Sequence, residues 1–346
     1  MRSQIKQNRF AQYAWAVLAL NLLVILWGGY VSASGSGDGC GASWPHCEQF
    51  QDLTTTPLKT FVEVSHRLSS GLAFLAVVGL TISSFRRYTK GHLLRHAAAI
   101  SLFFMFTESL VGALIVLMRW VADSDAIARV FTQPLHLVNT FLLLASLALT
   151  AWWASGGAPL RLRQQGSVLR LLLVGYVALL LVGTTGTFAS LASHLFPAES
   201  FAAGVQQDFS AGAPFFVKLR IWHPIAAALA GLILVSIANT VATQRPTPYT
   251  YRLSRVVIAL FITEFLLGTT NAILNAPIAI QMIHLIMADA FWLVMVLLGA
   301  AALAETPVIA PSESKHSPTP PIPSTSRAEN FSRRGFLGQS SPKSRR

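Results

Sequence analysis

The sequence predicts an all-α membrane protein with eight transmembrane helices, arranged as two pseudo-symmetric four-helix bundles. Hydrophobic residues make up 53% of the 346-residue chain, charged residues only 12%, and the mean hydropathy is +0.53. A soluble globular domain is far less apolar than this. Eight apolar runs of roughly 20 residues are each long enough to cross a hydrocarbon core of about 30 Å as a helix. Similar polar motifs also occur in the same order in the two halves of the chain.

The eight predicted spans follow one another along the chain with polar connections between them. They lie near residues 12–34, 62–85, 96–118, 130–153, 168–190, 215–241, 254–273 and 280–303. Basic residues precede the first run, as they do in a signal peptide, but this run is long and lacks a clear small-residue cleavage site. We therefore expect the first run to be a retained helix.

The distribution of basic residues predicts the orientation in the membrane. Twenty of the 26 lysines and arginines lie in the N-terminal segment, in the second, fourth and sixth connections, and in the C-terminal segment. Basic residues in short loops favour the cytoplasmic side of a membrane. We expect a multi-pass protein of the cell (plasma) membrane with both termini in the cytoplasm. The net charge of +12 then reflects topology, so membrane lipid is an expected partner and nucleic acid is not.

Repeated motifs predict that the chain divides into an N-terminal half at residues 1–154 and a C-terminal half at 155–304. Each half carries a Glu-x-x-x-Gly motif followed by a Gln-x-x-His motif, and a further histidine heads an earlier span. In order, these are His66, Glu108, Gly112, Gln133 and His136 in the first half, and His223, Glu264, Gly268, Gln281 and His284 in the second. Three matches in order indicate duplication of a four-helix unit. Residues 305–346 are rich in Pro, Ser and Arg, and we expect a disordered cytoplasmic tail.

Four histidines are the main candidates for a binding site. His66, His136, His223 and His284 each lie near one end of a separate span, and the predicted topology puts all four at one depth. A single histidine in an apolar helix is often only a hydrogen-bonded structural residue. Ionisable groups within spans are costly, however, and usually mark function. Neutral imidazole is a good axial ligand for heme iron, and a bundle core is a common heme site. We expect two hemes, one between His66 and His136 and the other between His223 and His284.

One acidic residue lies beside these histidines. Glu63 precedes His66 by three residues, so the two side chains share a helix face. A carboxylate in this place could move protons, stabilise a cation or orient the imidazole. Alternatively, Glu63 pairs with Arg67 in the headgroup zone. The second half has no equivalent acid before His223, and this difference indicates that the first half performs chemistry while the second half holds a cofactor.

Other polar residues near the histidines have two interpretations each. Glu108 and Glu264 lie within spans three and seven, where they either form hydrogen bonds between helices or belong to a proton route. The basic residues at the outer edge either bind heme propionates or anchor the helices at the interface. They are Arg67, Arg129, Lys218 and Arg220.

The two cysteines lie in a glycine-rich segment of the first outer connection. Cys40 and Cys47 would face the outer, oxidising compartment. They form either a structural disulfide or a pair of redox-active thiols that exchange with an outer partner.

Taken together, the motifs resemble those of the heme A synthase family over residues 10–304. The resemblance rests on GSGDGCGASWPHC around the cysteines, Glu63-x-x-His66-Arg67, Gln133-x-x-His136, His223 and Gln281-x-x-His284. It implies an oxidoreductase that oxidises the C8 methyl group of heme O to a formyl group, with water as the oxygen source. The product is heme A for terminal cytochrome oxidase.

The resemblance also assigns roles to single residues. It implies that His223 and His284 are the axial ligands of a heme b cofactor, and that His66 and His136 hold the substrate heme O. Glu63 would be the catalytic acid, and Cys40 and Cys47 match a disulfide found in one bacterial subgroup. Heme O would be handed over by heme O synthase, the electron acceptor is unidentified, and a homo-oligomer is compatible with the family.

Three other functions compete with this interpretation. The first is a di-heme b-type membrane electron carrier, but such carriers usually stack hemes across the bilayer, whereas the four histidines here share one depth. A transporter built from repeats would bind its substrate at the midplane, and the sequence has no broken-helix signal. A thiol–disulfide membrane oxidoreductase would use the cysteines and leave the histidines without a role.

Overall fold

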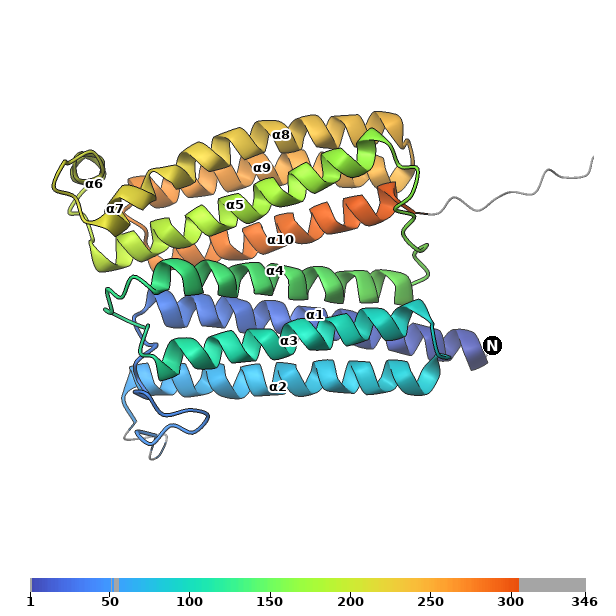
Figure 1. Ribbon diagram of the computed structural model, residues 1–346, viewed down its shortest axis with the longest axis horizontal. Helices are drawn as coiled ribbons and strands as arrows, with labels where there is room; N and C mark the ends of the chain where they lie inside the picture. Colours follow the sequence, from blue (N-terminus) through green and yellow to red (C-terminus); the bar gives the residue numbers. More distant parts are fainter. Residues whose placement is uncertain (1, 51, 53–55, 305–346) are drawn as a thin grey trace, which may run out of the picture. The chain divides into compact units, whose positions relative to one another are not determined.

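The computed structural model describes residues 2–50, 52 and 56–304 of the chain (Figure 1). Within this part of the chain it contains ten helices, and its only β-type pairing is the bridge between Leu160 and Ala304. Eight helical segments are long and apolar enough to cross a membrane, which confirms the predicted number of spans. The protein is therefore a multi-pass membrane protein. The predicted tail at 305–346 lies outside the described residues.

The helices agree closely with the predicted spans. They are α1 (Arg2–Ala33), α2 (Leu58–Arg87), α3 (Leu93–Leu117), α4 (Arg129–Ala154), α5 (Ser167–Leu195), α6 (Phe201–Asp208), α7 (Phe215–Arg220), α8 (Trp222–Gln244), α9 (Pro248–Ile273) and α10 (Ile278–Ala302). Two differences stand out. The sixth span is divided at Ile221 into α7 and α8, and α6 is a short helix that the hydropathy pattern did not predict. The hydroxyl of Ser200 caps α6 by accepting a hydrogen bond from the Ala203 N–H.

The spans form two closed groups of four. In the first group, α1 contacts α2, α2 contacts α3, α3 contacts α4, and α4 returns to α1. The second group closes in the same way through α5, α8, α9 and α10. Figure 1 shows the two groups side by side, with α4 and α1 of the first facing α10 and α5 of the second. This arrangement fits the pair of pseudo-symmetric bundles that the sequence predicts.

The core lies where the two groups meet. About half of the central residues of α4 and α10 are buried, a larger share than in any other span. Leu144, Leu147 and Ala151 on α4, together with Met295 and Leu298 on α10, are fully buried. Both central helices also carry one of the four histidines. The best-packed part of the molecule therefore supports the residues predicted to bind heme.

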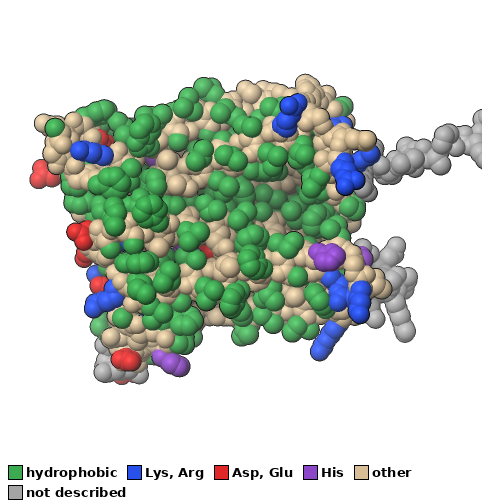
Figure 2. All heavy atoms as spheres, in the orientation of Figure 1, with side chains coloured by type: hydrophobic (Ala, Val, Ile, Leu, Met, Phe, Trp, Pro, Cys, Tyr) green, Lys and Arg blue, Asp and Glu red, His purple; other side chains and the backbone are tan. Residues whose placement is uncertain are grey.

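The outward faces are apolar, as a lipid environment requires. Leu68, Leu75 and Leu232 are each at least 66% exposed, and Figure 2 shows hydrophobic side chains over the middle of the visible face. In hydrocarbon every backbone polar group must be satisfied within the protein, and an α-helix does this along its own length. On this face several Lys and Arg side chains gather at one end, while acidic and basic side chains are mixed at the other.

The connections between the spans lie at two opposite ends of the helices. We call the end at which α2, α4, α7 and α10 begin the disulfide end, because the segment between α1 and α2 carries Cys40 and Cys47 there (Figure 1). The connections α2–α3, α4–α5 and α8–α9 lie at the opposite end. At that opposite end the Arg161 N–H donates to the Leu303 carbonyl over 2.8 Å, which joins the connection between the two groups to the end of α10.

Glycines allow close helix contact between the two groups. A Cβ atom at Gly29 of α1 would lie 2.4 Å from Leu285 of α10, and one at Gly183 of α5 would lie 2.8 Å from Leu137 of α4. Small residues at helix interfaces are the usual means of close approach in membranes, where the hydrophobic effect does not drive helices together. Leu137 and Leu285 directly follow His136 and His284, so these contacts fix the distance between the two histidine sites.

A pair of glycine substitutions tests the packing. At Gly231 of α8 an added Cβ would lie 1.8 Å from the Phe261 ring, and we expect Gly231→Ala to destabilise the protein by about 1–3 kcal/mol through overpacking. At Gly71 of α2 an added Cβ meets no atom within 4 Å. Gly71→Ala should therefore stabilise its helix by up to about 1 kcal/mol. Thermal unfolding in detergent measures both variants, and equal midpoints would contradict the packing around Gly231.

Candidate functional site

A cavity of about 1910 Å³ connects the two helical groups near the disulfide end. It is lined by His66, His136, His223 and His284, and also by Glu63. The four predicted ligands and the predicted catalytic acid thus line one continuous space. A large, mostly apolar cavity with a few convergent polar groups is the usual form of a cofactor or ligand site.

Each histidine ring lies against a glycine of the helix before it in the group. An added Cβ would lie close to the Cε1 atom of the ring in all four places: 2.8 Å at Gly28 for His66, 3.7 Å at Gly112 for His136, 3.2 Å at Gly186 for His223 and 3.3 Å at Gly268 for His284. A larger residue would push the ring out of place at three of the four. The same helix pairing, ring against glycine backbone, therefore recurs four times.

The spacing of His223 and His284 suits two ligands that bind one metal ion. The ring centres of His223 and His284 lie 6.3 Å apart, with the ring planes inclined by 73°. Two imidazole nitrogens that each lie about 2 Å from one metal ion place their ring centres about 6 Å apart. The pair thus stands at the separation that one iron held between two imidazoles requires.

The residues around the cavity fit heme groups on further grounds. The Nδ1 atoms of His66, His136 and His284 are buried and make no hydrogen bond with the described residues. Iron would bind the other ring nitrogen, Nε2, which leaves Nδ1 to face a group behind the ring, as in other metal-binding histidines. Since the donor set consists of neutral imidazoles in a bundle core, it is the set that heme iron prefers.

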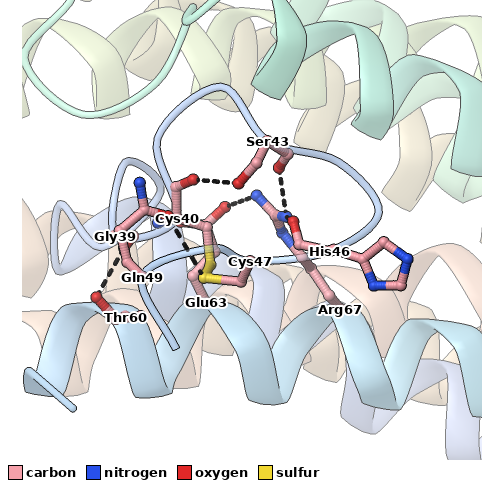
Figure 3. A network of polar contacts seen from close by, with 9 residues as sticks. All are labelled: Gly39, Cys40, Ser43, His46, Cys47, Gln49, Thr60, Glu63 and Arg67. Carbon is pink, nitrogen blue, oxygen red and sulfur yellow. Dashed lines mark hydrogen bonds and ion pairs between the residues drawn. A yellow bond between two sulfur atoms is a disulfide. The ribbon is translucent and has the colours of Figure 1, made fainter. Parts of the chain in front are cut away.

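Glu63 is the most buried carboxylate near His66, and it is contacted by the segment between α1 and α2 that carries Cys40 and Cys47, which we call the disulfide loop (Figure 3). The residue is 2% exposed, and its Oε2 atom accepts a 2.8 Å hydrogen bond from the Cys40 N–H. Its other oxygen forms an ion pair with Arg67. The alternative predicted for Glu63, pairing with Arg67, is therefore present, and it occurs together with a place at the cavity wall.

Arg67 connects Glu63 to the same loop. Its Nη1 atom donates to the Ser43 carbonyl over 2.6 Å and to the His46 carbonyl over 3.0 Å. Figure 3 shows the guanidinium between these carbonyls and Glu63. One planar, permanently charged group thus holds two loop carbonyls and a carboxylate at once in a fixed fork geometry, which the ammonium group of a lysine lacks.

The cysteines form a disulfide, with an S–S distance of 2.05 Å. The sequence left open whether the two cysteines form a disulfide or remain thiols, and the structure confirms the disulfide. The loop closed by Cys40 and Cys47 packs directly on the start of α2, where the Thr60 hydroxyl donates to the Gly39 carbonyl over 2.7 Å. A Cβ at Gly39 would lie 2.6 Å from α2 backbone atoms, so only glycine fits there.

The other basic residues at the disulfide end also hold loops. Arg129 is buried and donates to the Ala122 and Ser124 carbonyls. Arg220 forms an ion pair with Asp208 at 2.6 Å, which fastens α6 beside the cavity. Lys218 donates to the Ala211 carbonyl over 3.3 Å. These contacts hold end segments in place, and the two interpretations offered for these residues, binding of heme propionates and anchoring at the interface, both stay predictions.

Glu108 and Glu264 face the histidines of the next helix. Glu108 lies 3.4 Å from His136 Nδ1, and Glu264 lies 2.8 Å from His284 Nδ1. Each carboxylate therefore bridges an odd span to the span that follows it. Of the two interpretations of these acids, the contact between helices is present in both halves.

Sequence reasoning missed Asp289 on α10. Its residue exposure is 0%, and neither carboxylate oxygen has a hydrogen-bond partner among the described residues. The signal was available, because an acidic residue inside an apolar span is expensive and usually functional. Only the stronger pattern of the four histidines drew attention in that region.

An aromatic contact between the two helical groups was also missed. Trp292 of α10 stacks on Phe141 of α4 with ring centres 5.0 Å apart, and its Nε1–H donates to the Phe141 carbonyl over 2.6 Å. Both residues line the cavity. No sequence period could reveal this pair, because the two residues are 151 positions apart.

Comparisons with known proteins show what the chain is similar to. Residues 48–296 match the COX15-CtaA family model, described as cytochrome oxidase assembly protein. The protoheme IX farnesyltransferase of Thermus thermophilus is 46% identical over 296 residues, covering 86% of this chain and 49% of the relative. The heme A synthase of Bacillus mycoides is 37% identical over 107 residues, covering 31% of this chain and 34% of the relative. The chain thus spans at most about half the length of these relatives.

A substitution of Arg67 tests how the disulfide loop is held. Arg67→Lys removes the forked contacts to the Ser43 and His46 carbonyls, and hydrogen bonds to a charged group contribute about 1.5–3 kcal/mol each. We expect the backbone amides of residues 39–47 to exchange at least about tenfold faster, measured by hydrogen–deuterium exchange. Arg119→Lys changes an exposed arginine at the same end and should leave the rates unchanged. Equal exchange in both variants would show that Arg67 does not fix the loop.

Proposed function

The chain belongs to the heme A synthase family of cytochrome oxidase assembly proteins, and on this premise we propose that it converts heme O to heme A. The C8 methyl group of heme O would be oxidised to a formyl group, which makes the protein an oxidoreductase acting on a CH group. The observation that carries the proposal is the cavity with two histidine pairs, in which a buried carboxylate, Glu63, lies one turn before the first histidine of only one pair.

The relatives support a heme substrate that carries a farnesyl group. The Thermus relative is named for farnesyl transfer to protoheme IX, and heme O is the farnesylated form of that heme. The Bacillus relatives are named heme A synthases. These names belong to proteins of which this chain covers half or less, so the substrate and its delivery by heme O synthase are proposals for this chain.

We assign the C-terminal half, residues 155–304, to a resident heme b. His223 and His284 would be its axial ligands, because their rings stand 6.3 Å apart at the cavity. The bound heme would supply one-electron acceptance close to the substrate. The protein itself contributes the glycine backbone at Gly186 and Gly268, which orients both rings.

We assign the N-terminal half, residues 1–154, to the substrate. His66 and His136 would hold heme O, and Glu63 would act at the methyl group. Oxidation of a methyl group to a formyl group takes one oxygen atom from water and releases four protons and four electrons. A carboxylate one turn before the ligand His66 can accept such protons and can stabilise positive charge that develops at the carbon.

Glu63 is held firmly for this role. The Cys40 N–H and the Arg67 guanidinium fix its two oxygens, so the carboxylate does not swing away as charge develops. In the second half Arg220 stands three residues before His223, and it pairs with Asp208. A cation in this place cannot act as a base, which favours the first half as the reacting half.

We place the protein in the plasma membrane with the disulfide end outward and both termini in the cytoplasm. The disulfide between Cys40 and Cys47 supports this orientation, because disulfides persist in oxidising compartments. The basic residues of the α2–α3, α4–α5 and α8–α9 connections support it from the opposite end.

Removal of the Glu63 carboxylate tests the proposed chemistry. Glu63→Gln keeps the shape of the side chain but cannot take up a proton, and loss of a general base lowers rates by about 10²–10⁴-fold. The hemes of protein purified from cells that supply heme O are extracted and separated by chromatography. We expect heme B with heme A or a hydroxylated heme O intermediate in the wild type, and loss of the formyl product in the variant.

Glu48→Gln is the matched control, because Glu48 is an exposed acid in the segment between α1 and α2 that contacts Glu63. It should leave the amount of heme A unchanged. Heme A at wild-type level in Glu63→Gln would remove Glu63 from the mechanism. Heme B alone in a redox-active wild type would favour the di-heme electron carrier instead.

Histidine substitutions test the division between the halves. In cells that make heme B but no heme O, we expect His223→Ala and His284→Ala to lose most of the bound heme, because each removes one of its two ligands. His66→Ala and His136→Ala should keep it. The heme-to-protein ratio from absorbance spectra is the measurement, and His96→Ala, an exposed residue of α3, is the control. Equal losses from both pairs would contradict the separate roles of the halves.

A further inference from the structure

In each half, a glutamate and a glycine one turn apart grip a single histidine ring. Glu264 lies 2.8 Å from His284 Nδ1, and Gly268 of the same helix leaves room for the Cε1 edge of that ring. Glu108 and Gly112 enclose His136 in the same way, with 3.4 Å between carboxylate and Nδ1. The repeated Glu-x-x-x-Gly motif is therefore a cradle for the histidine of the following span.

The other histidine of each half has a different neighbour. His223 Nδ1 lies 3.4 Å from the Thr185 hydroxyl. Among the described residues, neither His66 nor His223 forms an ion pair with a carboxylate. The carboxylate contact thus distinguishes one ligand from the other in both pairs.

The two cradles differ in how the carboxylate charge is shared. Glu108 also accepts a 2.6 Å hydrogen bond from the Asn139 amide and a hydrogen bond from the Thr140 hydroxyl. Asn139 and Thr140 follow His136 by three and four residues, and the residues in the same places after His284 are Met287 and Ala288. Neither of these side chains can donate a comparable hydrogen bond.

Glu264 has no such donor beside it among the described residues. Its Oε1 atom is buried and has no hydrogen-bond partner among the described residues, while its Oε2 atom faces His284. The N–H bond at His284 Nδ1 does not point at that oxygen, so the short contact is not a hydrogen bond in this structure. Rotation about the terminal torsion of a histidine side chain is soft, so binding of a metal at Nε2 can complete the alignment.

We propose that Glu264 is a positioning residue that retains the C-terminal heme, and that the weaker Glu108 contact leaves the N-terminal heme free to exchange. A carboxylate that accepts the Nδ1–H fixes the tautomer, presents Nε2 to the metal and makes the imidazole a stronger donor. In the N-terminal half the donors Asn139 and Thr140 draw the charge of Glu108 away from His136. This inference rests on the proposed function, because it requires a cofactor that stays and a substrate that leaves.

Loss of bound heme from the purified full-length protein tests the role of Glu264. Excess apomyoglobin takes up released heme b, and the rate of transfer is followed by absorbance. We expect Glu264→Gln, which removes the charge and keeps the volume, to accelerate heme loss by about 10–100-fold, the usual effect of removing such an outer-shell partner. We also expect a more positive midpoint potential, because the charged carboxylate stabilises the ferric state, and a mere packing defect would not produce that shift.

Thr263→Ala is the matched control, since Thr263 is the exposed neighbour of Glu264 on α9. It should leave both the transfer rate and the potential unchanged. The inference would be overturned if Glu264→Gln lost heme at a rate within twofold of the wild type and had the same midpoint potential within error. A wild type that binds no heme b would instead overturn the proposed function, so the two failures are distinguishable.

Exchange of the two patterns tests the difference between the cradles. Ala288→Thr introduces a hydroxyl that can reach Glu264, and it should accelerate heme b loss in the same direction as Glu264→Gln. In the other half, Asn139→Met combined with Thr140→Ala copies Met287 and Ala288. We expect this double variant to retain product heme after purification and to turn over more slowly than the wild type. Unchanged retention in both exchanges would show that sharing of the carboxylate charge does not decide which heme stays.

Discussion

Contact between an imidazole ring and the bare backbone of a glycine sets the arrangement of all four histidines. A helix packs against its neighbour at a distance that side chains decide, and a Cβ on the facing residue would press on the ring at three of the four places. Gly28 and Gly186 avoid this contact at one histidine of each pair and Gly268 at a third, whereas the fit at Gly112 is looser. Two further glycines, Gly29 and Gly183, bring the two bundles together beside the same rings. The site is thus built from backbone proximity before any polar contact is considered.

The sequence predicted the parts of this arrangement that repeat along the chain. Spans could be placed within a few residues, because a run of apolar residues must form a helix that satisfies its own backbone. The histidines stood out because polar residues inside such runs are rare. The Cys40 N–H contact to Glu63 could not be predicted, since it depends on how a glycine-rich loop folds back on α2. Asp289 and the stacking of Trp292 on Phe141 were missed because they have no counterpart in the other half.

The two halves share the predicted repeat of motifs, and the departures from that repeat explain how the halves can differ in function. Where the first half places Glu63 before its histidine, the second half places Arg220. Both residues contact an end segment near the cavity, Glu63 through the Cys40 N–H and Arg220 through Asp208. Only the first half, however, places a carboxylate three residues before a histidine that lines the cavity. One difference in residue type therefore gives only the first half the carboxylate that the proposed chemistry needs, while the frame of the bundle stays the same.

In the proposed function, two similar macrocycles occupy one cavity and must be held with different strengths. The proposed ligands cannot supply this difference, because all four are histidines in equivalent places. The difference must come from groups behind the ligands, and the carboxylates on α3 and α9 are the groups that contact them. Hydrogen bonds from Asn139 and Thr140 on one side, and apolar Met287 and Ala288 on the other, change the electrostatic environment of the imidazole without moving it. Affinity can then diverge between the halves while the geometry of the four rings, fixed by glycine, remains common to both.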